Sequence, residues 1–169
     1  MAKCRAIVKN AKMYKRILVA IDGSDTSILA LNEAIKLAKD QHSSLRLIHV
    51  LDPIIISMVI QQRPGRPPVE APNVVEYRKS YKTVAKKIIA DGSAIARQAG
   101  IEPDAALVVP NALSQHVYDV IEHDAKRWRA DLIVIGTHGR RGIRRLLLGS
   151  VAEGLTRIAS KPVLLVRGR

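Results

Sequence analysis

The sequence predicts an α/β fold in which strands and helices alternate around an open parallel sheet. Short aliphatic runs without polar alternation are typical of strands that are buried on both faces. Segments with apolar residues at helical spacing separate these runs. A glycine-rich loop follows one run, and in such folds ligands bind beyond the carboxyl ends of the strands.

The first part of the chain predicts a β-α-β unit. Residues 16–21 form a continuous aliphatic run that ends at the turn 22–24. Ser24 or Asp25 is a suitable N-cap for the following helix, whose spaced apolar residues are Ile28, Leu31, Ile35 and Ala38. A second strand is predicted over 45–50, and the crossover between the two strands is expected to be right-handed.

The middle of the chain predicts a loop and a long helix. Five prolines between 51 and 75 argue against a long helix there, so we expect an exposed loop with at most a helical turn near 54–60. A helix is predicted from about 75 to 99, and Gly100 is its stop. Its apolar stripe is Val84, Ile88, Ile95 and Ala99.

The second half continues the alternation of strands and helices. Val117, Val120 and Ile121 are expected to face inward from a helix. The predicted strands are 105–109, 132–135 and 162–166, and the predicted helices are about 113–127 and about 150–159. The last strand starts with Pro162, which is tolerated at that position.

Composition limits the classes of function. A chain of 169 residues is expected to form one domain with a real core. Its net charge of +13 favours nucleotides, nucleic acids or anionic lipids without choosing among them. Aromatic residues are only 3%, which weakens a single-strand-binding role because such proteins stack bases on aromatic rings. No run approaches the roughly 20 apolar residues of a membrane span, so no membrane association is expected.

Residues 1–13 are predicted to be a basic, poorly ordered extension, and residues 14–169 the folded domain. The extension lacks the apolar centre and cleavage pattern of a signal peptide; a transit peptide, or a true start at Met13, remains an alternative. The single cysteine, Cys4, excludes an internal disulfide and fits a reducing compartment. We therefore expect a cytoplasmic protein.

The strongest chemical signal lies between the strand at 132–135 and the helix at 150–159. Glycine frees backbone amides, and amides beside a helix N-terminus suit a phosphate group. The glycines concerned are Gly136, Gly139 and Gly149, and Ser150 follows them. Neither a P-loop nor a dinucleotide fingerprint is present. The same segment contains Arg140, Arg141, Arg144 and Arg145, which neutralise phosphate or form a solvated face.

Asp22 is the candidate partner of this loop. If the strands at 16–21 and 132–135 are neighbours, Asp22 faces the glycines across one crevice. A carboxylate repels phosphate but accepts hydrogen bonds from ribose hydroxyls. A tight turn without a ligand is the alternative explanation for Gly136 and Gly139. No Ser-His-Asp or Cys-His set and no metal-ligating set is convincing, so no catalytic or metal residue is predicted.

The pattern Gly-x2-Gly-x9-Gly-Ser resembles the ATP-binding signature of the universal stress protein (UspA-like) family. Segments 14–24, 49–52, 147–152 and 161–166 are similar to other parts of that family, so the resemblance spans about 14–167. It implies a Rossmann-like three-layer sandwich with a five-stranded parallel sheet in the order 3-2-1-4-5. It also implies a homodimer, and the fifth strand would offer an exposed edge for pairing.

The resemblance also implies a nucleotide site. The acidic residue after the first strand would hold ribose, and the two residues before it and the end of the second strand would contact the base. The residue before the first glycine would lie against the nucleoside. The glycine loop would hold ribose and phosphate, and the start of the last helix would bind phosphate. The implied residues are Ala20, Ile21, Asp22, Val50, Ile135, Gly136, Gly139, Gly149, Ser150 and Val151. Of the four arginines in the loop, Arg140 is included in the predicted site as a phosphate ligand.

Because every glycine of the signature is present, the chain resembles the ATP-binding branch of the family. The expected function is a stress-response sensor or switch that binds ATP, with Mg²⁺ and a protein partner of unknown identity. A slow ATP-hydrolysing enzyme is one alternative, although no general base is evident. A nucleic-acid-binding protein that uses its basic surface is the other alternative.

Overall fold

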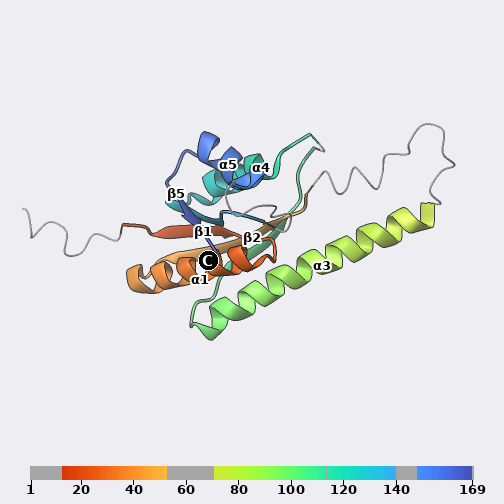
Figure 1. The fold of residues 1–169 in the computed structure, drawn as a ribbon. Coiled ribbons are helices and arrows are strands. Elements are labelled where there is room, and N and C mark those ends of the chain that lie inside the picture. Colours follow the sequence, from red (N-terminus) through yellow and green to blue (C-terminus); the bar gives the residue numbers. More distant parts are fainter. Residues whose placement is uncertain (1–12, 53–70, 113, 140–147, 169) are drawn as a thin grey trace, which may run out of the picture.

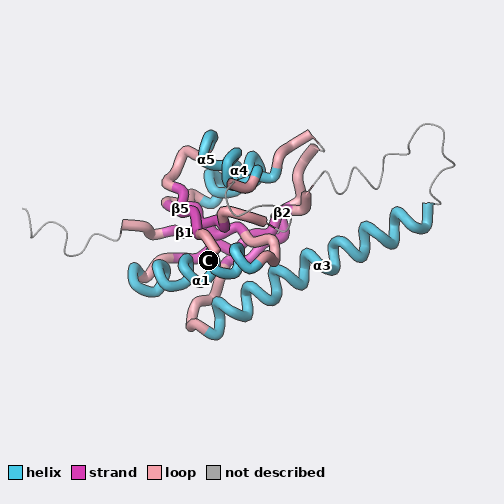
Figure 2. Tube along the Cα trace, in the orientation of Figure 1, coloured by secondary structure: helices cyan, strands magenta, loops and turns pink. Residues whose placement is uncertain are grey.

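The computed structural model describes residues 13–52, 71–112, 114–139 and 148–168, with only the backbone of 71–75, 77 and 78. The chain forms a three-layer α/β sandwich (Figure 1). One helical layer contains α1 (Asp25–Gln41) and α3 (Ala71–Gln98), and the other contains α4 (Val117–Trp128) and α5 (Ser150–Ile158). Figure 2 shows the strands in magenta as the central layer between these helices.

The central sheet is parallel throughout. Its strands are β1 (Arg16–Ala20), β2 (Ser44–Val50), β3 (Asp104–Val108), β4 (Leu132–Gly136) and β5 (Val163–Val166). They pair in the order β3-β2-β1-β4-β5, which confirms the predicted topology. In the part of the chain that the structure describes, no helix combines the length and the apolar content needed to cross a bilayer.

The strands β1, β2, β4 and β5 supply side chains to two cores, because successive residues point to opposite faces of the sheet. The edge strand β3 contributes to the core on the α4 and α5 face. Ile17 and Val19 pack with α1 and α3, whereas Leu18 and Ala20 pack with α4 and α5. This burial on both faces is the reason that the strands are continuous aliphatic runs without polar alternation.

Local capping residues define the helix ends. Ser24 is the N-cap of α1, and its hydroxyl accepts a hydrogen bond from the Ser27 amide. Gly100 follows α3 with φ of 82°, a left-handed conformation that favours glycine and stops the helix as predicted.

The start of α3 and part of its predicted stripe differ from the sequence prediction. The helix begins at Ala71, not near 75, because Pro72 lies in the first turn, where proline loses no helical hydrogen bond. The predicted turn near 54–60 lies outside the described residues. Val84 is 43% exposed because the first half of α3 projects beyond the sheet (Figure 1). Ile88 and Ile95 do pack against the core.

Helix α4 also begins later than predicted, at Val117 instead of about 113. The reason is a capping box at its start. The amide of His116 donates to Asp119 Oδ2 over 3.2 Å, and His116 is the extended N-cap residue.

A buried ion-pair network joins β2, β3 and α4. Arg46 lies in the middle of β2 and is only 6% exposed. Its guanidinium donates to both carboxylate oxygens of Asp124, from Nε over 2.6 Å and from Nη2 over 3.1 Å. It also donates from Nη1 to Asp104 over 2.7 Å. Asp124 accepts a further hydrogen bond from Arg127. Charges buried in this way are tolerated because each one is paired.

The pKa of Asp124 reports the strength of this network. Burial by itself would raise the pKa, but the hydrogen bonds and positive charges of Arg46 and then Arg127 hold it below its usual range. A lowered carboxylate pKa stabilises the fold above the unfolded-state pKa of about 3.9. The stabilisation is lost as the pH falls through the folded-state value.

We predict that Asp124→Asn lowers the free energy of unfolding by about 3 kcal/mol at neutral pH, since it leaves the buried Arg46 undercompensated. Asp104→Asn is the control, because the Asp104 side chain is 53% exposed and its loss should cost about 1 kcal/mol or less. Urea denaturation measures both values. The variant should also lose much of the acid destabilisation that the wild type shows below about pH 4. Equal effects of the two substitutions would contradict the assigned roles.

Candidate functional site

The carboxyl ends of β1, β2 and β4 meet at one edge of the sheet. Ala20 lies level with Ile135 of β4 and with Ile48 of β2. Ala20, Val50 and Ile135 belong to the same core cluster, on the α4 and α5 face, and each keeps 7–8% of its surface exposed. Ala20 and Val50, which are predicted to contact the base, therefore share one face of the sheet with Ile135, which is predicted to lie against the nucleoside.

Ile21 faces the opposite side. Its side chain is packed in the core formed with α1 and α3. Its carbonyl oxygen lies 2.7 Å from Nδ1 of the buried His49, and its amide donates to Ile48. Any contact of Ile21 with a ligand on the face of Ala20 would therefore involve its backbone.

Asp22 touches the glycine loop, as expected for neighbouring strands β1 and β4. A Cβ atom added at Gly139 would lie only 2.6 Å from Asp22 Oδ2. The other oxygen, Oδ1, accepts hydrogen bonds from the Ser24 amide over 3.0 Å and the Ser24 hydroxyl over 2.6 Å. The carboxylate is therefore held by the turn that starts α1 and lies against the loop that follows β4.

The signature glycines are needed for close packing within the protein. None of Gly136, Gly139 and Gly149 has positive φ, so a left-handed turn does not account for them. A Cβ at Gly136 would lie 2.9 Å from the carbonyl carbon of Thr26, which is part of α1. A Cβ at Gly149 would lie 3.1 Å from the Thr137 oxygen, which accepts the Gly149 amide over 2.8 Å.

The start of α5 lies beside the same loop. Gly149 is the N-cap of α5 and has no side chain to satisfy the first-turn amides. Ser150 is exposed, and Val151 is half-buried against the core. Uncapped amides at a helix N-terminus attract anions. Arg140, Arg141, Arg144 and Arg145 lie outside the described residues.

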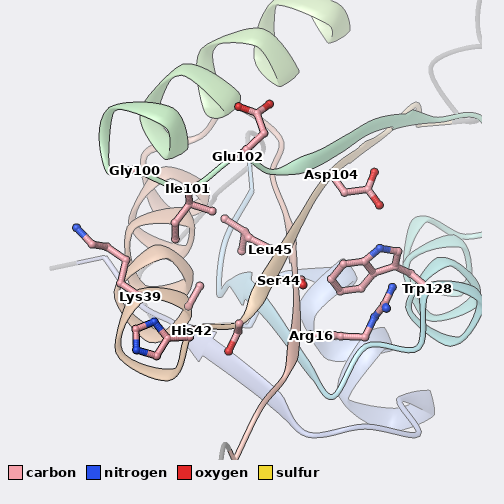
Figure 3. Close-up of a pocket in the computed structure, with 12 residues that line it drawn as sticks. Arg16, Lys39, His42, Ser44, Leu45, Gly100, Ile101, Glu102, Asp104 and Trp128 are labelled. Atoms are coloured by element: carbon pink, nitrogen blue, oxygen red, sulfur yellow. The ribbon is translucent and has the colours of Figure 1, made fainter.

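A cavity of about 720 Å³ lies at the other end of the sheet (Figure 3). Residues at or near the starts of the strands, such as Arg16, Leu45 and Asp104, line it, and so does Trp128 at the end of α4. The Arg16 guanidinium carbon lies 4.2 Å from the centre of the Trp128 ring, and Asp104 is already paired with Arg46. This cavity is therefore separate from the edge that carries Asp22 and the glycines.

Within 13–52, 71–112, 114–139 and 148–168, no three or more His, Cys, Asp or Glu residues lie close enough to hold a metal ion. Among the described residues, Asp22 is the carboxylate that lies against the glycine loop. A hard cation such as Mg²⁺ is commonly bound through one or two carboxylates and substrate phosphates. The site is therefore better suited to Mg²⁺ that is carried by a phosphorylated ligand than to Mg²⁺ that is held by protein ligands alone.

We predict that Gly136→Ala lowers the free energy of unfolding by about 1 to 3 kcal/mol, because the new methyl group meets the backbone of α1. Gly139→Ala should cost less, since the Asp22 carboxylate that it meets can rotate away. Urea denaturation of the two variants tests this order. A larger loss for Gly139→Ala would show that the loop is held mainly through Asp22.

Comparison with known proteins places this geometry in a family. The model of the Universal stress protein family matches residues 13–167. The chain is similar to Universal stress protein YxiE of Bacillus subtilis, with 31% identity over 155 residues that cover 92% of this chain and 100% of the relative. The solved structure of hypothetical protein MJ0577 is similar with a TM-score of 0.76 and 25% identity, over 93% of this chain and 98% of that chain.

Two further solved structures contain nucleotides. A universal stress protein in complex with cAMP is similar with a TM-score of 0.63 and 26% identity, over 91% of this chain and 97% of that chain. The universal stress protein from Archaeoglobus fulgidus in complex with dAMP has a TM-score of 0.59 and 26% identity, over 91% and 98% of the respective chains. With the family model and the curated relative both spanning nearly the whole fold, the chain belongs to the universal stress protein family.

Proposed function

We propose that this universal stress protein binds an adenine nucleotide, ATP with Mg²⁺, at the edge formed by Asp22, the glycine loop and the start of α5. The observation that carries the proposal is the contact between the Asp22 carboxylate and Gly139, beside the uncapped first turn of α5. This arrangement offers an acceptor for ribose hydroxyls next to amides that suit phosphates. Relatives solved with cAMP and dAMP support the choice of adenine nucleotides.

Each predicted residue has a role in this proposal. Ala20 and Val50 offer apolar surface to the base, and Ile135 offers apolar surface to the nucleoside. Ile21 offers only backbone. The phosphates would be held by Gly136, Gly139, Arg140, Gly149, Ser150 and Val151. When bound, Mg²⁺ supplies positive charge that neutralises the phosphates. The bound nucleotide then acts as a signal in a stress response, through the conformation that the protein presents to its partner.

We predict that Asp22→Asn weakens ATP binding about ten- to a hundredfold, because a charged acceptor for the ribose hydroxyls is lost. Asparagine keeps an oxygen that can accept the two hydrogen bonds from Ser24, so the turn should be preserved. Calorimetric titration with ATP, in the presence and absence of Mg²⁺, measures the change.

Asp40→Asn is the matched control, since Asp40 is an exposed carboxylate in the last turn of α1. It should bind ATP like the wild type. The same samples are assayed for ADP and AMP. Turnover that disappears in Asp22→Asn would favour the slow ATPase, and the absence of ATP binding by the wild type would overturn the proposal.

We also propose that the protein forms a homodimer through β5. Among the described residues this strand pairs with β4 alone, so it lies at the edge of the sheet. Its four residues, Val163–Val166, are all aliphatic and only half-buried in the single chain. An exposed apolar edge strand favours pairing with another strand, and a second copy of the chain offers an identical one.

We predict that sedimentation equilibrium shows a dimer whose population rises with protein concentration. The physical reason is that pairing of two β5 edges satisfies backbone groups and removes aliphatic side chains from water. A monomer throughout the accessible concentration range would contradict this assembly without affecting the nucleotide proposal.

A further inference from the structure

Thr26 connects the start of α1 to the glycine loop. It is the second residue of α1, and its hydroxyl donates a hydrogen bond to the carbonyl oxygen of His138. Its side chain is confined on the other side as well, since a Cβ at Gly168 would lie 3.0 Å from Thr26 Cγ2. The absence of a side chain at Gly136 lets the Thr26 backbone come this close.

The hydrogen bond to His138 has a consequence for the next amide. Peptide bonds are planar and trans, and the described residues contain no cis peptide, so the carbonyl of His138 and the N–H of Gly139 point in opposite directions. A partner that holds the carbonyl therefore also fixes the direction of the Gly139 N–H. The peptide before it is held in the same way, because the Gly149 amide donates to the Thr137 carbonyl over 2.8 Å.

The two peptide groups Thr137–His138 and His138–Gly139 are thus both held in fixed orientations. Within the described part of the chain, neither the His138 N–H nor the Gly139 N–H donates a hydrogen bond to the protein. A backbone N–H group carries partial positive charge, so an oriented N–H attracts anions. The loop is therefore prepared for an anionic group before any ligand arrives.

We propose that Thr26 is a positioning residue for nucleotide binding: its hydroxyl holds the peptide between His138 and Gly139 so that the Gly139 amide is oriented for a nucleotide phosphate. The proposal rests on the proposed function, and it extends the site to a residue that lies outside the glycine signature. Thr26 acts on the ligand through the loop, so it sets affinity without contacting the nucleotide.

A pair of substitutions separates the two parts of the Thr26 side chain. Thr26→Val keeps the branched shape and the methyl contact near Gly168 but removes the hydroxyl. Thr26→Ser keeps the hydroxyl and removes the methyl group. In calorimetric titrations with ATP and Mg²⁺, we expect Thr26→Val to bind about tenfold more weakly than the wild type. Thr26→Ser should bind nearly as tightly as the wild type, which a purely packing role would not produce.

Amide hydrogen exchange of the free proteins provides a second measurement. In Thr26→Val the segment 136–139 should exchange faster than in the wild type and in Thr26→Ser, while the strands remain protected. Unchanged ATP affinity in Thr26→Val, or equal weakening in both variants, would overturn the positioning role. If the wild type binds no ATP, the proposed function fails. Exchange still decides whether Thr26 orders the loop, and unchanged exchange in Thr26→Val then overturns the positioning role too.

Discussion

The parallel order of the sheet is the constraint on which the site depends. Parallel strands all end at the same edge, so residues that are far apart in sequence, such as Asp22, Val50 and Gly136, come together there. The central position of β1 makes its end the neighbour of both β2 and β4. A helical layer on each face then leaves the edge as the place where polar groups and backbone amides can meet a ligand.

Packing and ligand binding both require that the glycine loop lies close to its neighbours. Gly136 and Gly149 must be glycine because neighbouring backbone atoms leave no room for a side chain. The same closeness brings Asp22, the loop and the start of α5 into one site. A bulky substitution at Gly139 would displace Asp22, so a loss of binding in such a variant would not identify the atoms that touch the nucleotide. The hydroxyl and carboxylate substitutions are more informative because they preserve shape.

The strands could be predicted to within about one residue because they are buried on both faces, which leaves a strong aliphatic pattern. The contact between Asp22 and the loop followed from strand order and was confirmed.

Sequence reasoning missed Arg46, whose partners Asp104 and Asp124 lie on other elements. It also missed Thr26, whose partner is His138. Pairings between such distant residues leave no local pattern. The exposure of Val84 depends on where α3 extends beyond the sheet, and the spacing of apolar residues within the helix does not indicate that position.

The turn from Asp22 to Thr26 also links binding to the order of a helix. This turn holds the candidate ribose acceptor, the N-cap of α1 and the hydroxyl that fixes the loop. A ligand that binds only when the loop is ordered must stabilise the first turn of α1. By reciprocity, fraying of that turn must lower the affinity for the ligand. Helix ends fray at lower temperatures than a buried sheet unfolds. The affinity of such a site would therefore fall on warming while the core is still intact, and release of a bound nucleotide would then be an early response to heat.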